Sequence, residues 1–201
     1  MKDKLTGSLL TAAAVLLTGA AMAQAGGEQP QMTPEQKATM EAYQKAGTPG
    51  EPHKTLAATA GTYSTKTKSW EAPGGPAMEE TGTATRTMTL DGRVLVEEFN
   101  STMMGTPFVG HGMTGYDNVS GKYWSTWNDS MSTGLMVSQG KCDAKNSCTF
   151  TGSWNDPVKK APVKARMTTR WTSPTTEIFE YYGPAKDGKE FRMMEITYTK
   201  N

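Results

Sequence analysis

The chain has 201 residues, with 21 Lys and Arg against 20 Asp and Glu, a formal net charge of +1 and two cysteines. This length is sufficient for one domain with a sizeable core. No basic run is present, so the sequence gives no support for binding to nucleic acid or to an anionic membrane surface.

The first residues have the order of a cleaved secretory signal. Two lysines precede an uncharged apolar run over residues 5–21, and small residues alternate after it. This order is typical of signal peptides. We therefore expect residues 1–23 to be a signal peptide that is cleaved near Ala23 or Ala25, and the mature chain to be periplasmic or secreted. No later segment is long and apolar enough to predict a membrane span.

A linker that carries a surface helix is expected over residues 24–51. Thr33 has the position of an N-cap, a proline follows it, and Gln36 completes a capping box, while Gly47 is typical of a helix stop. One short helical turn is expected between this linker and Gly61.

From Gly61 onward the periodicity changes from that of helices to that of strands. Threonine, valine and aromatic residues dominate, and turn-forming residues recur at short intervals without a helix-length segment between them. Parallel strands need long crossovers, so the sheet should be antiparallel. Closing such a sheet removes its exposed edges. The prediction for the domain over residues 52–201 is all-β, an antiparallel up-and-down barrel of about ten strands preceded by one short N-terminal helix.

One hairpin allows a prediction of register. If Asp91–Gly92 is a two-residue turn, Arg86 lies opposite Glu97, and Ala84 lies opposite Phe99 on the same side. This side is the more apolar one and should face inward, which makes Arg86 and Glu97 a cross-strand ion pair inside the barrel. A register slip that leaves both charges in water is the alternative.

The stretch from Gly110 to Trp127 predicts a second hairpin. With a turn over residues 118–121, Trp127 lies opposite Gly112 and covers the bare strip formed by Gly110 and Gly112. His111 falls on the opposite face of the same strand.

The two cysteines, Cys142 and Cys148, are separated by five residues of turn type. In an exported protein this spacing predicts a disulfide across a hairpin tip, which would contribute about 2 kcal/mol at most. A redox-active pair would need different spacing, typically C-x-x-C.

Arg166 and Arg170 alternate with a threonine on one face of a predicted strand. The opposite face carries Met167 and Trp171, so we expect both arginines to point outward. The reverse parity would place two arginines inside the barrel, where they would hold a carboxylate.

Several stretches resemble known families. Gly61-Thr62-Tyr63 resembles the Gly-x-Trp opening of the first strand in lipocalin-like (calycin) barrels, with Tyr in place of Trp. The stretches "GTATRTM", "CTFTGSW" and "FRMMEITYTK", and the long segment that begins "EEFNSTMM", closely resemble a bacterial family catalogued as domain of unknown function 1579, over roughly residues 52–200. This resemblance implies a calycin-like barrel and brings no activity, substrate or catalytic residue.

The favoured function is binding of a small molecule inside the barrel. The candidate lining is Arg86, Glu97, Trp127 and Tyr198, and the expected ligand is apolar, lipid-like or acidic, with Arg86 free to meet an acidic head group. No catalytic residue and no cofactor is assigned, and the oligomeric state is not predicted.

Two alternatives stay open. The first is an enzyme, either haem-dependent or of isomerase type, that uses His111 as a ligand or the pair Arg86 and Glu97 as reacting groups. The second is a structural protein whose barrel is filled by methionine and aromatic side chains.

Overall fold

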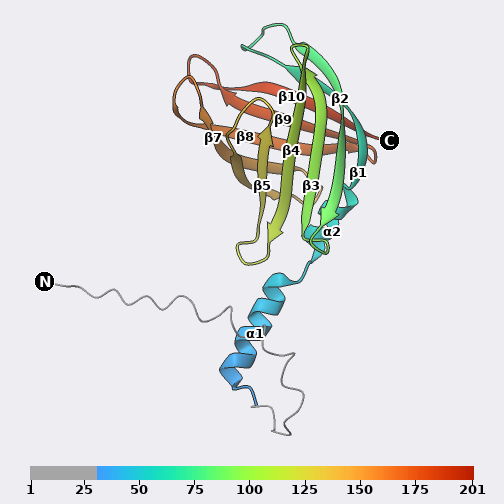
Figure 1. Cartoon of the computed structure of the whole chain (residues 1–201), viewed down its shortest axis with the longest axis vertical. Coiled ribbons are helices and arrows are strands. Elements are labelled where there is room, and N and C mark those ends of the chain that lie inside the picture. Colours follow the sequence, from blue (N-terminus) through green and yellow to red (C-terminus); the bar gives the residue numbers. More distant parts are fainter. Residues whose placement is uncertain (1–30) are drawn as a thin grey trace, which may run out of the picture. The chain divides into compact units, whose positions relative to one another are not determined.

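A computed structural model describes residues 31–201, and its main body is a closed barrel of ten antiparallel strands (Figure 1). The strands are β1 (Gly61–Ser69), β2 (Met78–Thr89), β3 (Val94–Met103), β4 (Thr106–Asp117), β5 (Lys122–Asp129), β6 (Met136–Cys142), β7 (Cys148–Asp156), β8 (Ala161–Ser173), β9 (Thr176–Pro184) and β10 (Glu190–Lys200). Each strand pairs with its neighbours in sequence, and β1 pairs with β10 to close the sheet. The predicted up-and-down barrel is confirmed.

The signal peptide predicted over residues 1–23 lies outside the described residues. Among residues 31–201, no helix has both the length and the apolar character that crossing a bilayer requires.

Two helices precede the barrel: α1 (Pro34–Gly47) and α2 (Glu51–Ala58). The predicted capping box of α1 is present, because the Gln36 amide donates to Thr33 Oγ1 at 3.2 Å and the Thr33 amide donates to Gln36 Oε1 at 2.8 Å. No side chain of α1 is buried. The single helical turn that was expected before Gly61 is instead an eight-residue helix, α2.

Helix α2 lies at one end of the barrel and buries Leu56 there (Figure 1). Leu56 belongs to an apolar cluster with Leu95, Tyr123, Phe150 and Met167, which come from β3, β5, β7 and β8. The residue that follows α2 is also linked to the first strand, because Tyr63 Oη donates a hydrogen bond to Thr59 O at 2.5 Å. This end of the barrel is therefore covered by α2 and by the apolar cluster that contains Leu56.

The register of the β2–β3 hairpin is the predicted one, with Arg86 opposite Glu97 and Ala84 opposite Phe99. The loop is longer than the predicted two-residue turn, because pairing stops at Thr89 and Val94. Residues 90–92 all have positive φ, at 50°, 51° and 81°. The loop is longer than predicted by one residue on each side. Because this extension is symmetric, it leaves the register of the two strands unchanged, and the predicted pairing is correct although the predicted turn length is wrong.

The β4–β5 hairpin also has the predicted register, with Gly112 opposite Trp127 and His111 opposite Asn128. At the tip of the β6–β7 hairpin, Cys142 pairs directly with Cys148 and the two form the predicted disulfide.

Candidate functional site

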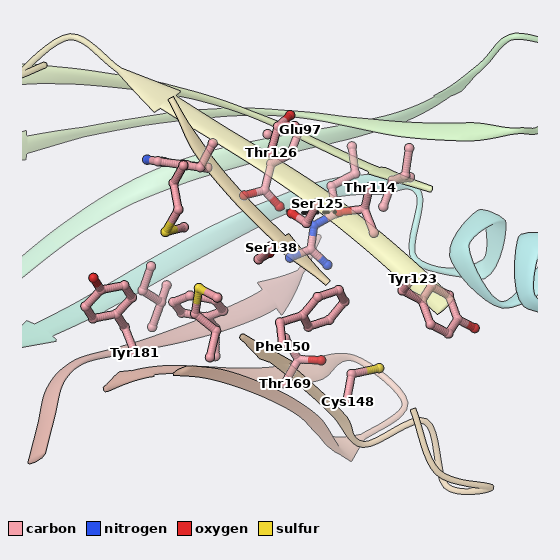
Figure 2. Close-up of a pocket in the computed structure, with 18 of the residues that line it drawn as sticks. Glu97, Thr114, Tyr123, Ser125, Thr126, Ser138, Cys148, Phe150, Thr169 and Tyr181 are labelled. Atoms are coloured by element: carbon pink, nitrogen blue, oxygen red, sulfur yellow. Dashed lines mark hydrogen bonds and ion pairs between the residues drawn. The ribbon is translucent and has the colours of Figure 1, made fainter. Parts of the chain in front are cut away.

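The barrel encloses a cavity of about 400 Å³ whose lining residues come from α2 and from every strand except β1, and Figure 2 shows part of this lining. Its side chains fall into three groups: hydroxyls on one wall, aromatic and methionine side chains on another, and an ion cluster between β2, β3 and β9.

The hydroxyl wall explains why the barrel is hollow. Thr114, Ser125 and Ser138 lie directly opposite one another on β4, β5 and β6, and Gly152 on β7 continues the row. In a small barrel, large inward side chains normally fill the interior. Four small residues in one row leave space instead, and Figure 2 shows the three hydroxyl residues on the same side of the cavity.

The apolar wall is built from large side chains on the remaining strands. Trp127 lies over the bare backbone of Gly110 and Gly112, as predicted, and a Cβ at Gly110 would collide with its indole ring. The indole Nε1 donates to Asp129 Oδ2 at 3.0 Å, which fixes the ring. Other large apolar lining residues include Met136, Phe150, Met167, Trp171, Phe179, Tyr181, Met194 and Ile196.

The cavity reaches the surface where β6 is short. Pairing between β5 and β6 ends at Trp127 and Met136, so Asn128 and Asp129 run past the end of β6. Trp154 and Asn155 do the same on β7. All four of these residues line the cavity, together with Ser132, Gly134 and Leu135 of the β5–β6 loop. These three loop residues are exposed, so the loop forms an outer part of the cavity wall.

The ion cluster joins three strands. Arg86 Nε on β2 lies 2.5 Å from Glu97 Oε2 on β3, and Arg86 Nη1 lies 2.5 Å from Glu177 Oε2 on β9. The side chains of Arg86, Glu97 and Glu177 are only 9%, 15% and 7% exposed. The guanidinium also lies over the rings of Tyr198 and Tyr63, with 4.5 Å and 4.8 Å to the ring centroids.

Burial and charge fix the protonation of two members of this cluster. Burial by itself would lower the pKa of Arg86, but Glu97 and Glu177 outweigh burial and raise this pKa well above its ordinary value. Burial, helped by the negative charge of Glu97, also raises the pKa of Tyr198 well above its ordinary value. Tyr198 therefore stays protonated, and its hydroxyl donates a hydrogen bond to Glu97 Oε1 at 3.2 Å.

The structure brings all four sequence-derived lining candidates, Arg86, Glu97, Trp127 and Tyr198, to the cavity wall. The inward placement of Arg86 and Glu97 is correct, and the alternative of a solvated pair is not. Arg86 is not free to meet an acidic head group as expected, because Glu97 and Glu177 already contact its guanidinium at Nε and Nη1.

Sequence reasoning missed Glu177, although a signal for it exists. In β9, Glu177 shares its strand face with Phe179 and Tyr181, since side chains alternate along a strand. Two large aromatic residues on one face indicate that this face points inward, and the glutamate goes with them.

His111 lies away from the cavity. It is exposed on the outer face of β4, opposite Asn128, and does not line the pocket. The second histidine, His53, is buried in α2, where its Nδ1 accepts from the Gly50 amide at 3.0 Å and its ring meets Tyr116 edge-on. In the part of the chain from residue 31 to the end, no three His, Cys, Asp or Glu side chains are grouped in a way that could hold a metal ion.

The arginines of β8 point outward, as expected. Arg166 bonds Glu190 on β10 and stacks over the Tyr182 ring at 3.8 Å, while Arg170 pairs with Glu180 at 2.8 Å. These contacts form a charged outer face over β8, β9 and β10, separate from the cavity.

Comparison with known proteins adds a family and a weak structural likeness. No match was found among curated proteins. A solved structure of a redesigned beta barrel is similar at 14% identity, over 73% of this chain and 94% of that chain, with a TM-score of 0.37. Residues 48–200 match the family described as "Protein of unknown function (DUF1579)". Since this match spans most of the chain, the protein belongs to that family.

Proposed function

We propose that this protein is a binding module, which holds one small and largely apolar molecule inside its barrel. The observation that carries this proposal is the cavity of about 400 Å³. Its size falls within the range of small-molecule sites, roughly 300–1,000 Å³. Like such sites, it combines an apolar lining with a few polar groups at defined positions.

The lining supports an apolar body rather than a fully polar ligand. Methionine and aromatic side chains form flexible and polarisable contact surface for hydrocarbon. Facing them, the hydroxyls of Thr114, Ser125 and Ser138 offer hydrogen bonds that would fix the orientation of a bound molecule.

Binding is favoured over catalysis by the way the polar groups are engaged. The guanidinium of Arg86 is held by two carboxylates, and His111 lies on the outer face. The resemblance of Gly61-Thr62-Tyr63 to the Gly-x-Trp opening of lipocalin-like barrels, with Tyr63 in the place of Trp, supports a relationship to other ligand-carrying barrels.

Part of the proposal concerns location. The order of two lysines, an apolar run and small residues at the start of the chain supports export and cleavage near Ala23 or Ala25. Intact-mass measurement of protein recovered from an extracytoplasmic fraction tests this step, and a mass equal to that of the full chain would contradict it.

Native mass spectrometry of the exported protein tests the binding function. We expect a bound mass that is lost under denaturing conditions. The variant Ser125→Leu places a larger side chain in the cavity and should abolish the adduct. Ser153→Leu makes the same change on the outer face of β7 and should retain it.

An exported protein that carries no adduct, and that binds no member of a panel of small apolar compounds, would rule the proposal out. So would equal loss of the adduct in Ser125→Leu and Ser153→Leu, because the molecule would then not lie in the cavity.

A further inference from the structure

The charges inside the barrel do not balance. Arg86 contributes one positive charge, and its two partners Glu97 and Glu177 contribute two negative charges. With all three groups ionised, one negative charge remains in excess in a largely apolar interior. A buried charge of this kind is unfavourable unless a donor or an opposite charge meets it.

The cluster leaves one carboxylate oxygen without a donor. Glu177 Oε2 accepts from Arg86, while Oε1 has no donor among the described residues. In this part of the chain, Thr65 Oγ1 is the one side-chain oxygen or nitrogen that is both sealed from solvent space and without a partner. Glu177 Oε1 is therefore not sealed, although its side chain is only 7% exposed, and Glu177 lines the cavity.

The other two charged groups are less available. Both oxygens of Glu97 are engaged, one by Arg86 and the other by Tyr198 Oη. The guanidinium of Arg86 lies between two carboxylates and against two tyrosine rings. A ligand carboxylate would have to displace one of these carboxylates or add a third negative charge to the cluster.

Aromatic residues flank Glu177 on both neighbouring strands. In the register of the sheet, Glu177 lies directly between Trp171 on β8 and Tyr198 on β10. Trp171 lines the cavity. A cation held near Glu177 Oε1 would thus have Trp171 and Tyr198 on the neighbouring strands, where cation–π attraction can add to a charge-assisted hydrogen bond.

We propose that the molecule bound in this cavity is a cationic amphiphile, an amine whose ammonium group contacts Glu177 Oε1 and whose apolar body lies against the aromatic and methionine wall. This inference rests on the proposed binding function and specifies its ligand class. The proposed head group is therefore basic, in contrast to the acidic head group considered in the sequence analysis.

Three probes with the same tail and different head groups test the proposal: decylammonium, decanol and decanoate. Each is titrated into the mature protein by calorimetry and followed by the fluorescence of the tryptophans that line the cavity. We expect decylammonium to bind about tenfold more tightly than decanol, and decanoate to bind more weakly than either.

The variant Glu177→Gln keeps the shape of the side chain and removes its charge, while Arg86 retains Glu97. It should reduce the preference for decylammonium over decanol to about twofold or less and leave decanol affinity unchanged. Glu190→Gln removes a carboxylate from the outer face, where it bonds Arg166, and should leave all three affinities as they are.

The outcomes separate this inference from the function beneath it. If none of the probes binds, the cationic ligand is refuted, and the native-mass and panel measurements decide the binding function separately. If decanol binds and decylammonium has no advantage, or if decanoate binds most tightly, the cationic ligand is refuted and the binding function stands. Persistence of the amine preference in Glu177→Gln would also refute the role of Glu177. Should that variant fail to fold, the comparison of the three probes on the unmodified protein decides the question alone.

Discussion

Replacement of Arg86 by methionine should strongly destabilise the barrel. Methionine keeps much of the apolar stem and removes the guanidinium that lies over the rings of Tyr63 and Tyr198, so the main change is loss of the charged group. Glu97 and Glu177 are then left in the interior without their shared partner.

The expected magnitude follows from burial. Removing one partner of a buried ion pair typically costs about 3–5 kcal/mol. Two carboxylates lose their partner here, which would increase this figure. Tyr198 still donates to Glu97, and Glu177 Oε1 reaches the cavity, which both reduce it. We expect a loss of about 4 kcal/mol in the free energy of unfolding, a large part of the roughly 5–15 kcal/mol that stabilises a typical domain.

Equilibrium unfolding in urea, followed by tryptophan fluorescence, measures this loss at neutral pH. Arg166→Met is the matched control, because that arginine lies on the outer face with a partially exposed partner, and it should cost no more than about 1 kcal/mol. The triple variant in which Arg86→Met is combined with Glu97→Gln and Glu177→Gln should recover most of the stability, since no uncompensated charge remains. A loss below about 0.5 kcal/mol in Arg86→Met would refute the reasoning and show that water screens the cluster.

Three further changes have defined outcomes. Gly110→Ala adds a Cβ that collides with the indole of Trp127, so it should lower the unfolding free energy by about 1–3 kcal/mol and shift the tryptophan emission. Replacing both Cys142 and Cys148 by serine should cost about 2 kcal/mol in thermal unfolding, and thiol titration of the unmodified protein should find no free thiol. Burial acts to raise the pKa of Glu180, but hydrogen bonds from two arginines outweigh burial and lower this pKa. The stability that Glu180 contributes is therefore present above its unfolded pKa and is lost as pH falls through the lower folded value, so Glu180→Gln should differ from the unmodified protein at neutral pH and converge with it in acid.

Controls for these changes lie elsewhere in the same chain. Gly47→Ala meets no atom within 4 Å and should leave the stability and the emission unchanged, and an equal loss in both glycine variants would contradict the collision with Trp127. For the disulfide, adding a reductant to the serine variant should have no effect, whereas it should destabilise the unmodified protein. A constant difference between Glu180→Gln and the unmodified protein across the acid range would contradict the direction of the Glu180 pKa.

Much of the candidate site follows from alternation along single strands. The parity of β2 and β3 placed Arg86 and Glu97 on the apolar face, and the hairpin between them set the register even though its loop is longer than predicted. Gly110 and Gly112 opposite Trp127 followed in the same way. These relations are local, since a short loop joins the two strands and side chains point to alternate faces.

Closure of the barrel determines contacts between distant strands, which local sequence patterns do not predict. Glu177 is 91 residues away from Arg86 in sequence, and the two meet only because β9 and β10 curl back to β1. The sequence alone predicted strands, faces, a disulfide and one ion pair. The tertiary structure decided that a row of small residues on β4–β7 leaves the interior hollow, and that two carboxylates share one guanidinium. Both features depend on which side chains face each other across the barrel. Barrel closure and side-chain volume determine these contacts, and spacing along the chain does not.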